Sequence, residues 1–246
     1  MANTLVLIPS RMSATRLPGK PLLKINNLSI IAHVFKRAEE ANIGEVVVAT
    51  EDQEILEDVL KNGGKAVLTS RDHKTGTDRV FEAYKKLNIK DIDYILNLQG
   101  DEPNINKEDI INLNNFAINN DFEIGTLAAT IKDKKMLTNK NIVKVLTKNK
   151  LKKDNFSTAL NFTRDDLSKN NVNIYHHIGI YIYKINILEK FVTLDQTKNE
   201  IKDKLEQLRA LDNKIKINVV LAKSSPIGVD TEEDYLAIKK IMEYKL

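Results

Sequence analysis

Cysteine is absent from this sequence of 246 residues, and its absence excludes several kinds of site. Without a thiol, the chain can form no disulfide framework, no thiolate metal site and no cysteine nucleophile. Long apolar runs are missing too. The run at residues 5–8 is far too short for a signal peptide or a membrane-spanning helix, and no later run reaches that length. We therefore expect a cytoplasmic protein with no membrane insertion.

The charges are nearly balanced, and this excludes another class of partner. The formal net charge is +4, from 38 basic and 34 acidic residues that are interspersed along the chain. A nucleic-acid-binding protein would concentrate its basic residues on one face, so no nucleic-acid partner is expected. Hydrophobic residues make up 42% and charged residues 29%, which is typical of a folded chain. The length suits one large α/β domain, or a core with a smaller appended part.

The first half of the sequence alternates strand-like and helix-like segments. Short apolar runs predict strands over residues 4–8, 45–49, 66–69 and 94–98. Apolar residues at helical spacing predict helices over residues 29–41, 52–60, 76–87 and 107–119. This alternation predicts a parallel sheet with helices on both faces. Right-handed crossovers then bring the carboxyl ends of the strands to one edge, where ligands bind.

The second half is less regular. Strands are expected over residues 124–131, 142–147, 174–183 and 215–222, and helices over residues 185–191, 200–211 and 231–244. Residues 174–183 alternate strictly, with isoleucines on one face and Tyr175, His177, Tyr181 and Tyr183 on the other. Such alternation predicts a strand with one buried face and one functional or interfacial face.

A basic loop follows the first predicted strand. Arg11, Arg16 and Lys20 lie within ten residues, beside Gly19, which allows close approach of the backbone. Guanidinium groups and an ammonium are suited to a nucleoside triphosphate, although a solvated connecting loop is the alternative. The loop lacks the upstream glycine of a Walker motif, and Pro21 follows its lysine. No G-x-G-x-x-G occurs, so a P-loop kinase and an NAD dehydrogenase are both disfavoured.

Two carboxylates could hold a metal ion. Asp101 follows the fourth predicted strand and so faces the same edge as the basic loop. Mg²⁺ prefers few carboxylates together with phosphate oxygens, whereas the alternative makes Asp101 a turn residue. Asp230 precedes the last predicted helix, and Glu233 lies three residues on. This spacing fits a capping box, so a helix cap and a second metal ligand both remain open for Asp230.

Residues 72–79 begin another helix. Thr75, Gly76 and Thr77 offer hydroxyls and backbone N–H groups to a ligand, while the alternative makes Thr77 a plain N-cap. Arg79 could pair with a carboxylate or be a solvated helix charge. His73 has a loop context and no evident partner.

The last candidates belong to the second half. His177 and Tyr181 lie on the alternating strand, and this tyrosine-rich face could equally form a dimer interface. Arg164 lies upstream. Glu206 and Gln207 fall outside an apolar stripe and are therefore expected to be solvated.

Together these segments closely resemble the 3-deoxy-manno-octulosonate (Kdo) cytidylyltransferases, also called CMP-Kdo synthetases. The T-R-L-P-G-K-P element is shared with other sugar nucleotidyltransferases, whereas D-H-x-[ST]-G-T-[DE]-R and L-E-Q-L-R are more specific to the Kdo branch. The matching stretches run in family order at residues 8–11, 13–22, 72–79, 97–103, 177–181, 205–209 and 228–231.

The resemblance implies a glycosyltransferase-A-like (Rossmann-like) α/β fold, with a mostly parallel sheet and helices on both faces. It implies a single nucleotidyltransferase domain, with a nucleotide-binding core (1–130), a sugar-binding and dimerisation part (131–212) and a return to the core (213–246). The implied protein is a homodimer that converts CTP and Kdo, a 2-keto-3-deoxy sugar acid, to CMP-Kdo and pyrophosphate for lipopolysaccharide biosynthesis.

The resemblance also implies roles for particular residues. Phosphate-binding and catalytic roles fall on Arg11, Arg16 and Lys20, and metal-binding and catalytic roles on Asp101 and Asp230, with Mg²⁺ as the cofactor. Contacts with the nucleotide fall in addition on Thr75 and Gln99. Contacts with the sugar acid fall on seven residues: Arg79, Gln99, Arg164, His177, Tyr181, Glu206 and Gln207.

The sequence departs from the family pattern in places. Met12 stands near a usual aromatic position, residues 165–170 replace a Pro-containing stretch, and Ile182 stands where glycine is common. The last two departures leave a related sugar acid, such as 8-amino-Kdo, as an alternative substrate. A hexose-1-phosphate would need no arginines for a carboxylate. A catalytically lapsed nucleotide-binding protein is a further alternative, disfavoured by the retained carboxylates and cations.

Overall fold

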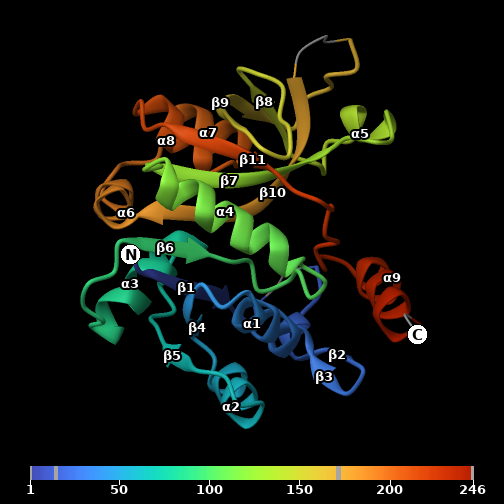
Figure 1. Ribbon diagram of the computed structural model, residues 1–246. Coiled ribbons are helices and arrows are strands. Elements are labelled where there is room, and N and C mark those ends of the chain that lie inside the picture. The colour runs from blue at the N-terminus through green and yellow to red at the C-terminus, as the bar shows by residue number, and fades with distance from the viewer. Residues whose placement is uncertain (1, 14–15, 170–172, 245–246) are drawn as a thin grey trace. The chain divides into compact units, whose positions relative to one another are not determined.

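The computed structural model describes residues 2–13, 16–169 and 173–244 (Figure 1). The chain packs into two compact units, one formed by residues 1–111 and 226–246 and the other by residues 112–225. This division rests on packing alone. The functional division expected from the sequence, into 1–130, 131–212 and 213–246, stays a prediction.

The first unit contains a parallel sheet with the strand order β5-β4-β1-β6. The strands are β1 (Thr4–Ser10), β4 (Gly44–Thr50), β5 (Ala66–Leu68) and β6 (Tyr94–Asn97). The apolar runs of β1 and β4 are fully or almost fully buried, as expected for parallel strands covered on both faces. Gly44 allows the close approach of β1, because a Cβ there would lie 1.8 Å from the Thr4 carbonyl oxygen.

Helices α1 (Ile30–Ala41), α2 (Gln53–Lys61) and α3 (Gly76–Leu87) connect these strands. Right-handed crossovers put α1 and α2 on one face of the sheet and α3 on the other, as the sequence predicted. Side-chain caps account for where α1 and α3 begin, because the Ser29 and Thr75 hydroxyls accept from backbone N–H groups three residues on.

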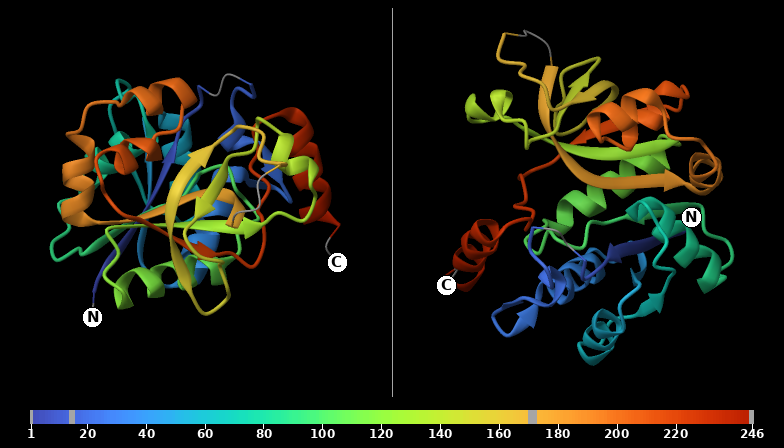
Figure 2. Two further views of the ribbon diagram at one scale, coloured as in Figure 1. Left: turned by 90° about the horizontal axis from the view of Figure 1, so that it is seen from above. Right: turned by 180° about the vertical axis from the view of Figure 1, so that it is seen from behind.

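The C-terminal residues return to the first unit. Helix α9 (Glu232–Glu243) packs against a small hairpin of β2 (Lys24–Ile25) and β3 (Leu28–Ser29), as Figure 2 shows. The hairpin was not predicted from the sequence. A buried cluster of Ile25, Ile30, Val229 and Ile238 joins these segments, and a short 3-10 helix, η1 (Lys20–Leu22), precedes the hairpin.

The second unit contains strands in the order β10-β7-β11-β9-β8, and β10 also pairs with β8, so the five strands close into a ring. Within this unit β11 and β7 are parallel, whereas β10–β7, β10–β8, β11–β9 and β8–β9 are antiparallel. The mostly parallel sheet expected from the sequence is thereby corrected to a mixed arrangement. The strands are β7 (Ile124–Thr130), β8 (Lys144–Thr147), β9 (Phe156–Thr163), β10 (Asn173–Lys184) and β11 (Ile217–Leu221).

Strand β10 differs from its expected form. Buried side chains lie on both of its faces, with Tyr175 and His177 on one and Ile178 and Ile180 on the other. The pairing with β7 shifts register between Ile178 and Tyr181, which indicates a β-bulge. The face expected to be functional or interfacial is therefore largely buried, with Tyr181 partly exposed, and its role stays a prediction.

The helix expected over residues 200–211 is two short helices. A capping box of Thr197 and Glu200 begins the first, and Lys204 ends it with a left-handed φ of 53°. Arg209 then reaches back from the second helix to Glu200, with a buried bidentate ion pair of 2.5 and 2.8 Å. The helices of the unit are α5 (Lys135–Thr138), α6 (Ile185–Val192), α7 (Lys198–Asp203) and α8 (Gln207–Asp212).

Helix α4 (Lys107–Asn119) begins in the first unit and continues into the second. Over the described residues, no helix is both long enough and apolar enough to cross a membrane.

Candidate active site

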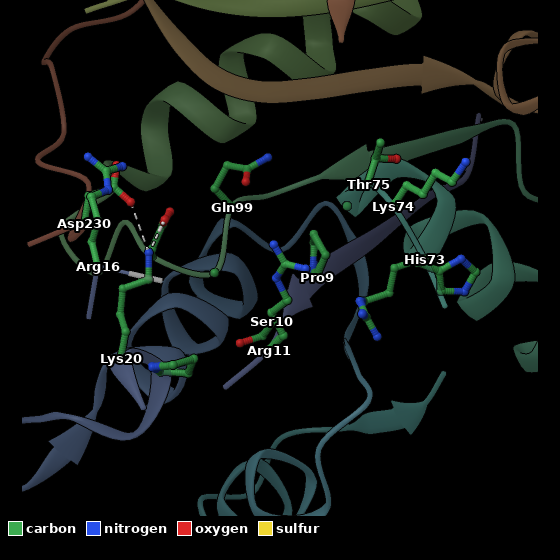
Figure 3. A pocket seen from close by; sticks show the side chains of 15 residues that line it. Pro9, Ser10, Arg11, Arg16, Lys20, His73, Lys74, Thr75, Gln99 and Asp230 are labelled. Carbon is green, nitrogen blue, oxygen red and sulfur yellow. Dashed lines mark hydrogen bonds and ion pairs between the residues drawn. The ribbon is translucent and has the colours of Figure 1, made fainter. Parts of the chain in front are cut away.

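A pocket of about 370 Å³ lies at the carboxyl ends of strands β1 and β6, entirely within the first unit (Figure 3). Each candidate phosphate-binding, metal-binding and nucleotide-contacting residue predicted from the sequence lines it. The lining residues are Pro9, Ser10, Arg11, Arg16, Lys20, Pro21, His73, Lys74, Thr75, Gly76, Arg79, Gln99, Gly100, Asp101 and Asp230.

The basic loop folds back on itself before η1. The Met12 backbone N–H donates to an Asp52 carboxylate oxygen at 2.7 Å, and the Met12 carbonyl accepts from the Gly19 N–H at 3.1 Å. Gly19 has a φ of 73°, a left-handed conformation that glycine adopts without strain. The Arg11 and Arg16 side chains are left exposed at the pocket, while the Lys20 side chain is largely enclosed. Residues 14 and 15 lie outside the described residues.

The two candidate metal carboxylates converge on Lys20. The Lys20 ammonium lies 2.8 Å from an Asp101 oxygen and 3.4 Å from an Asp230 oxygen. Arg16 lies 2.9 Å from the other Asp230 oxygen. Figure 3 shows the Lys20 side chain pointing toward Asp230. Residues separated by more than two hundred positions in the sequence thus form one charged cluster, and a cation already occupies the place between the carboxylates.

The cap of α9 is displaced by one residue from its expected place. Thr231 is the N-cap and Asp234 completes its capping box, instead of Asp230 and Glu233. The helix-cap interpretation of Asp230 is therefore wrong. Its carboxylate lies in the pocket, half exposed, and pairs with the basic loop.

The helix start at residues 75–77 also differs in detail. Thr75 is the N-cap, because its hydroxyl accepts from the Asp78 N–H, whereas Thr77 is buried. The alternative in which Thr77 caps the helix is wrong, because the cap lies two positions earlier. Thr75 and Gly76 still line the pocket, so the helix N-terminus faces it with its partial positive charge.

His73 has a partner that the sequence did not indicate. Its ring pairs with Glu82 on α3, which also accepts from Lys86 and from the Ser70 backbone N–H. Partial burial opposes ionisation, but these hydrogen bonds outweigh it and lower the pKa of Glu82 to about 2. Glu82 therefore stays ionised and fixes the loop before α3.

Arg79 is buried, so the alternative of a solvated helix charge is wrong. Its guanidinium pairs with Glu51 and donates to the Thr69 hydroxyl at 2.6 Å and the Ser70 carbonyl at 3.2 Å. The sequence indicated that Arg79 could pair with a carboxylate, and the carboxylate it pairs with here belongs to the chain itself. A contact with the sugar acid stays a prediction for this residue.

Glu102 was missed by the sequence analysis. It lies next to Asp101, and its side chain is buried with one carboxyl oxygen lacking a hydrogen-bond partner. Burial, and then the Asp101 charge, raise the pKa of Glu102 to about 8. Glu102 is therefore protonated at neutral pH, and Asp101 is the carboxylate of this turn that lines the pocket.

The second unit brings together three of its candidate sugar contacts. The His177 ring accepts from or donates to the Thr126 hydroxyl at 3.0 Å and packs 5.4 Å from the Tyr181 ring. The Tyr181 hydroxyl is buried without a hydrogen-bond partner. Burial, followed by the nearby Tyr183 and Glu206, raises the pKa of Tyr181 well above its ordinary value. Burial, with a smaller contribution from His176, lowers the pKa of His177 to about 3.

Glu206 and Gln207 are half-buried at the start of α8, so the expectation that they are solvated is wrong. Glu206 lies near enough to Tyr181 for its charge to contribute to the raised pKa of that tyrosine. Arg164, which follows β9, donates to the backbone carbonyls of Lys140 and Asn141 and so holds a neighbouring turn.

A parallel sheet with a basic loop and two carboxylates at its carboxyl edge is suited to an enzyme that binds a nucleotide there. A family model described as "Cytidylyltransferase" matches residues 5–217. The 3-deoxy-manno-octulosonate cytidylyltransferase of Rhodopseudomonas palustris (strain BisB5) is 44% identical over 98% of each chain. The enzyme of that name from Thermodesulfovibrio yellowstonii is also 44% identical, over 97% of this chain and 98% of its own.

Solved structures agree with the sequence relatives. A CMP:2-keto-3-deoxy-manno-octonic acid synthetase complexed with CTP superposes with a TM-score of 0.90 at 32% identity over all of both chains. A UDP-glucose pyrophosphorylase shares the fold, with a TM-score of 0.75 at 14% identity. The chain belongs to the 3-deoxy-manno-octulosonate cytidylyltransferase family.

Proposed function

We propose that this protein transfers the cytidylyl group of CTP to Kdo and releases pyrophosphate. The observation that carries the proposal is the convergence of Lys20, Asp101 and Asp230 in a pocket that Arg11 and Arg16 also line. The support for this substrate pair comes from the names of relatives that match nearly the full chain at 44% identity. The solved synthetase that resembles this chain was complexed with CTP.

The basic residues are placed to bind the triphosphate. Arg11 and Arg16 present exposed guanidinium groups, which bind phosphate oxygens in pairs, and Lys20 supplies a compact point charge. Pro21 opens η1 directly after Lys20 and restricts the backbone there. Positioning and charge neutralisation of this kind are the main protein contributions to phosphoryl transfer.

The residues present fit a Mg²⁺ ion. Asp101 and Asp230 both approach the Lys20 ammonium, so their oxygens already surround one cationic position. No cluster of three or more metal-ligating side chains occurs among the described residues. Mg²⁺ takes few carboxylates and completes its shell with water and phosphate oxygens, so two carboxylates would suffice for it. When bound, Mg²⁺ would neutralise phosphate charge and lower the pKa of the sugar hydroxyl.

The reaction balances as a single displacement. The anomeric hydroxyl oxygen of the sugar forms a bond to the α-phosphorus of CTP, and the bond from that phosphorus to the bridging oxygen breaks. The bridging oxygen leaves with its electron pair in pyrophosphate, and the hydroxyl proton passes to solvent. Arg16 and Lys20 stabilise the charge that develops on the phosphate oxygens.

Substrate selection rests on other residues. Thr75 and Gln99 line the pocket and are placed to contact the nucleotide, and Gln99 and Arg79 are the pocket's candidate sugar contacts. In the second unit, the clustering of His177, Tyr181 and Glu206 supports a role in binding a polar ligand. Gln207, Arg164 and assembly as a homodimer belong to the same proposal through the resemblance.

A pyrophosphate-release assay with Mg²⁺, CTP and a panel of sugar acids tests this function. We expect release with Kdo that exceeds release with 8-amino-Kdo and with other sugar acids. The Asp101→Asn variant should fold normally and lose turnover. Preference for another acid would correct the substrate, near-normal turnover by the variant would contradict the metal assignment, and no release with any acid would contradict the function.

A further inference from the structure

Two acidic residues follow strand β4, and neither lines the pocket. Glu51 and Asp52 form the turn between β4 and α2, where the Asp52 N–H donates to the Thr50 hydroxyl at 3.1 Å. Their carboxylates have separate partners, one in the basic loop and one at the start of α3. Both of those segments contribute residues to the lining of the pocket.

Asp52 holds the basic loop by its backbone. Its carboxylate accepts from the Met12 N–H at 2.7 Å, directly after Arg11. The Met12 carbonyl in turn accepts from the Gly19 N–H, directly before Lys20. The Asp52 carboxylate thus holds Met12, and Met12 holds Gly19 at the other end of the loop. The pocket cations Arg11 and Lys20 are the sequence neighbours of Met12 and Gly19.

Glu51 holds the other segment by a side chain. Its carboxylate pairs with Arg79, and both side chains are almost fully enclosed. Arg79 also donates to the Thr69 hydroxyl and the Ser70 carbonyl, so it links the end of β5 to the first turn of α3. The pair therefore sets the place of the helix N-terminus at Thr75 and Gly76, which lines the pocket.

We propose that Glu51 and Asp52 are positioning residues for the nucleotide site, with Asp52 setting the geometry of the phosphate-binding loop and Glu51 that of the nucleotide-contacting helix start. The proposal rests on the function proposed above. A charged acceptor makes the Asp52 bond stronger than a neutral one would be. Asp52 bonds the Met12 N–H and Glu51 the Arg79 guanidinium, so each carboxylate acts on the pocket through the segment that it holds.

The chain offers a matched control for Asp52. At the opposite end of β1, the Asn3 N–H donates to an Asp93 carboxylate oxygen at 2.8 Å. Both bonds join a backbone N–H that flanks β1 to an aspartate, yet only the Asp52 bond holds residues that line the pocket. The test compares Asp52→Ala, Asp52→Asn and Asp93→Ala with the unchanged protein.

We expect Asp52→Ala to raise the KM for CTP about tenfold while kcat changes much less, since one charged hydrogen bond that orders the loop is lost. Asp52→Asn should restore most of the affinity, because its amide oxygen accepts from the same Met12 N–H. Asp93→Ala should leave the KM unchanged. Equal KM shifts in Asp52→Ala and Asp93→Ala, or no shift in either, would overturn the proposal.

Amide hydrogen exchange of the free protein separates this proposal from the proposed function. Asp52→Ala should speed exchange at Met12 and Gly19 at least tenfold, and Asp93→Ala should not. This readout needs neither CTP nor a sugar acid. A protein that makes no CMP-sugar would refute the proposed function, whereas unchanged exchange at Met12 and Gly19 in Asp52→Ala would refute the positioning role.

Discussion

Burial at His177 changes how a single side chain responds to pH. The ordinary pKa of histidine is 6.5, and in the folded protein the pKa of His177 is lowered to about 3. Between these values the unfolded chain binds a proton that the folded chain does not. The free energy of unfolding must therefore fall as the pH drops from about 6.5 toward 3, and this loss is absent above pH 6.5.

We predict that His177→Gln removes this loss. Between pH 6 and pH 4, the unchanged protein should lose up to about 1.4 kcal/mol of stability per pH unit relative to the variant. Urea unfolding across this range measures the difference. At pH 7.5 both side chains are neutral, so the difference there should be constant and serves as the control. Parallel stability curves between pH 6 and pH 4 would contradict the burial of a neutral His177.

Single residues also show where the sequence analysis stopped. The residue types and spacing of Arg11, Arg16, Lys20 and Asp101 sufficed to place them together, because the topology brings the ends of β1 and β6 to one edge. The partners of Arg79 and His73 could not be foreseen, since those ion pairs depend on tertiary contacts between segments with no shared motif.

At the scale of elements, the start of α9 separates a structural residue from a functional one. Thr231 caps the helix, and its neighbour Asp230 faces the pocket instead. We predict that Thr231→Ala lowers the free energy of unfolding by about 1 kcal/mol and leaves turnover close to normal. Asp230→Asn should change stability by less than about 0.5 kcal/mol and reduce turnover at least about a hundredfold.

Thermal unfolding and steady-state kinetics of both variants check this pair of predictions. Each variant is the control for the other, because the two residues are adjacent and differ in what their side chains contact. Loss of stability in Asp230→Asn with normal turnover would restore the cap interpretation of Asp230. Loss of turnover in Thr231→Ala at normal stability would mean that the cap itself takes part in the chemistry.

The elements were predicted best where periodicity and caps agreed. Helices α3 and α4 have the bounds that the sequence indicated. The prediction of one helix over residues 200–211 was wrong. The apolar spacing continues across the break between α7 and α8, and only the left-handed backbone of Lys204 reveals that break. Strand β9 was missed, since exposed Leu160 and Asn161 interrupt the alternation that would mark it.

At the scale of the whole molecule, the alternating first half was predictable, because each parallel strand needs a crossover helix and the pattern repeats. The second unit was not, since its antiparallel pairings depend on which strands meet in the ring. The sequence therefore predicted the nucleotide side of the site from its own pattern. The candidate sugar contacts came from the resemblance and stay predictions, whereas the names of the relatives support the substrate itself.

The fate of the α-phosphorus tests the central claim most directly. CTP labelled at that phosphorus is incubated with the protein, Mg²⁺ and Kdo, and the labelled products are separated. The account predicts that the label passes into CMP-Kdo, that pyrophosphate is unlabelled, and that no transfer occurs without the sugar acid. Label found in CDP, or in free CMP regardless of Kdo, would contradict cytidylyl transfer as the function of this protein.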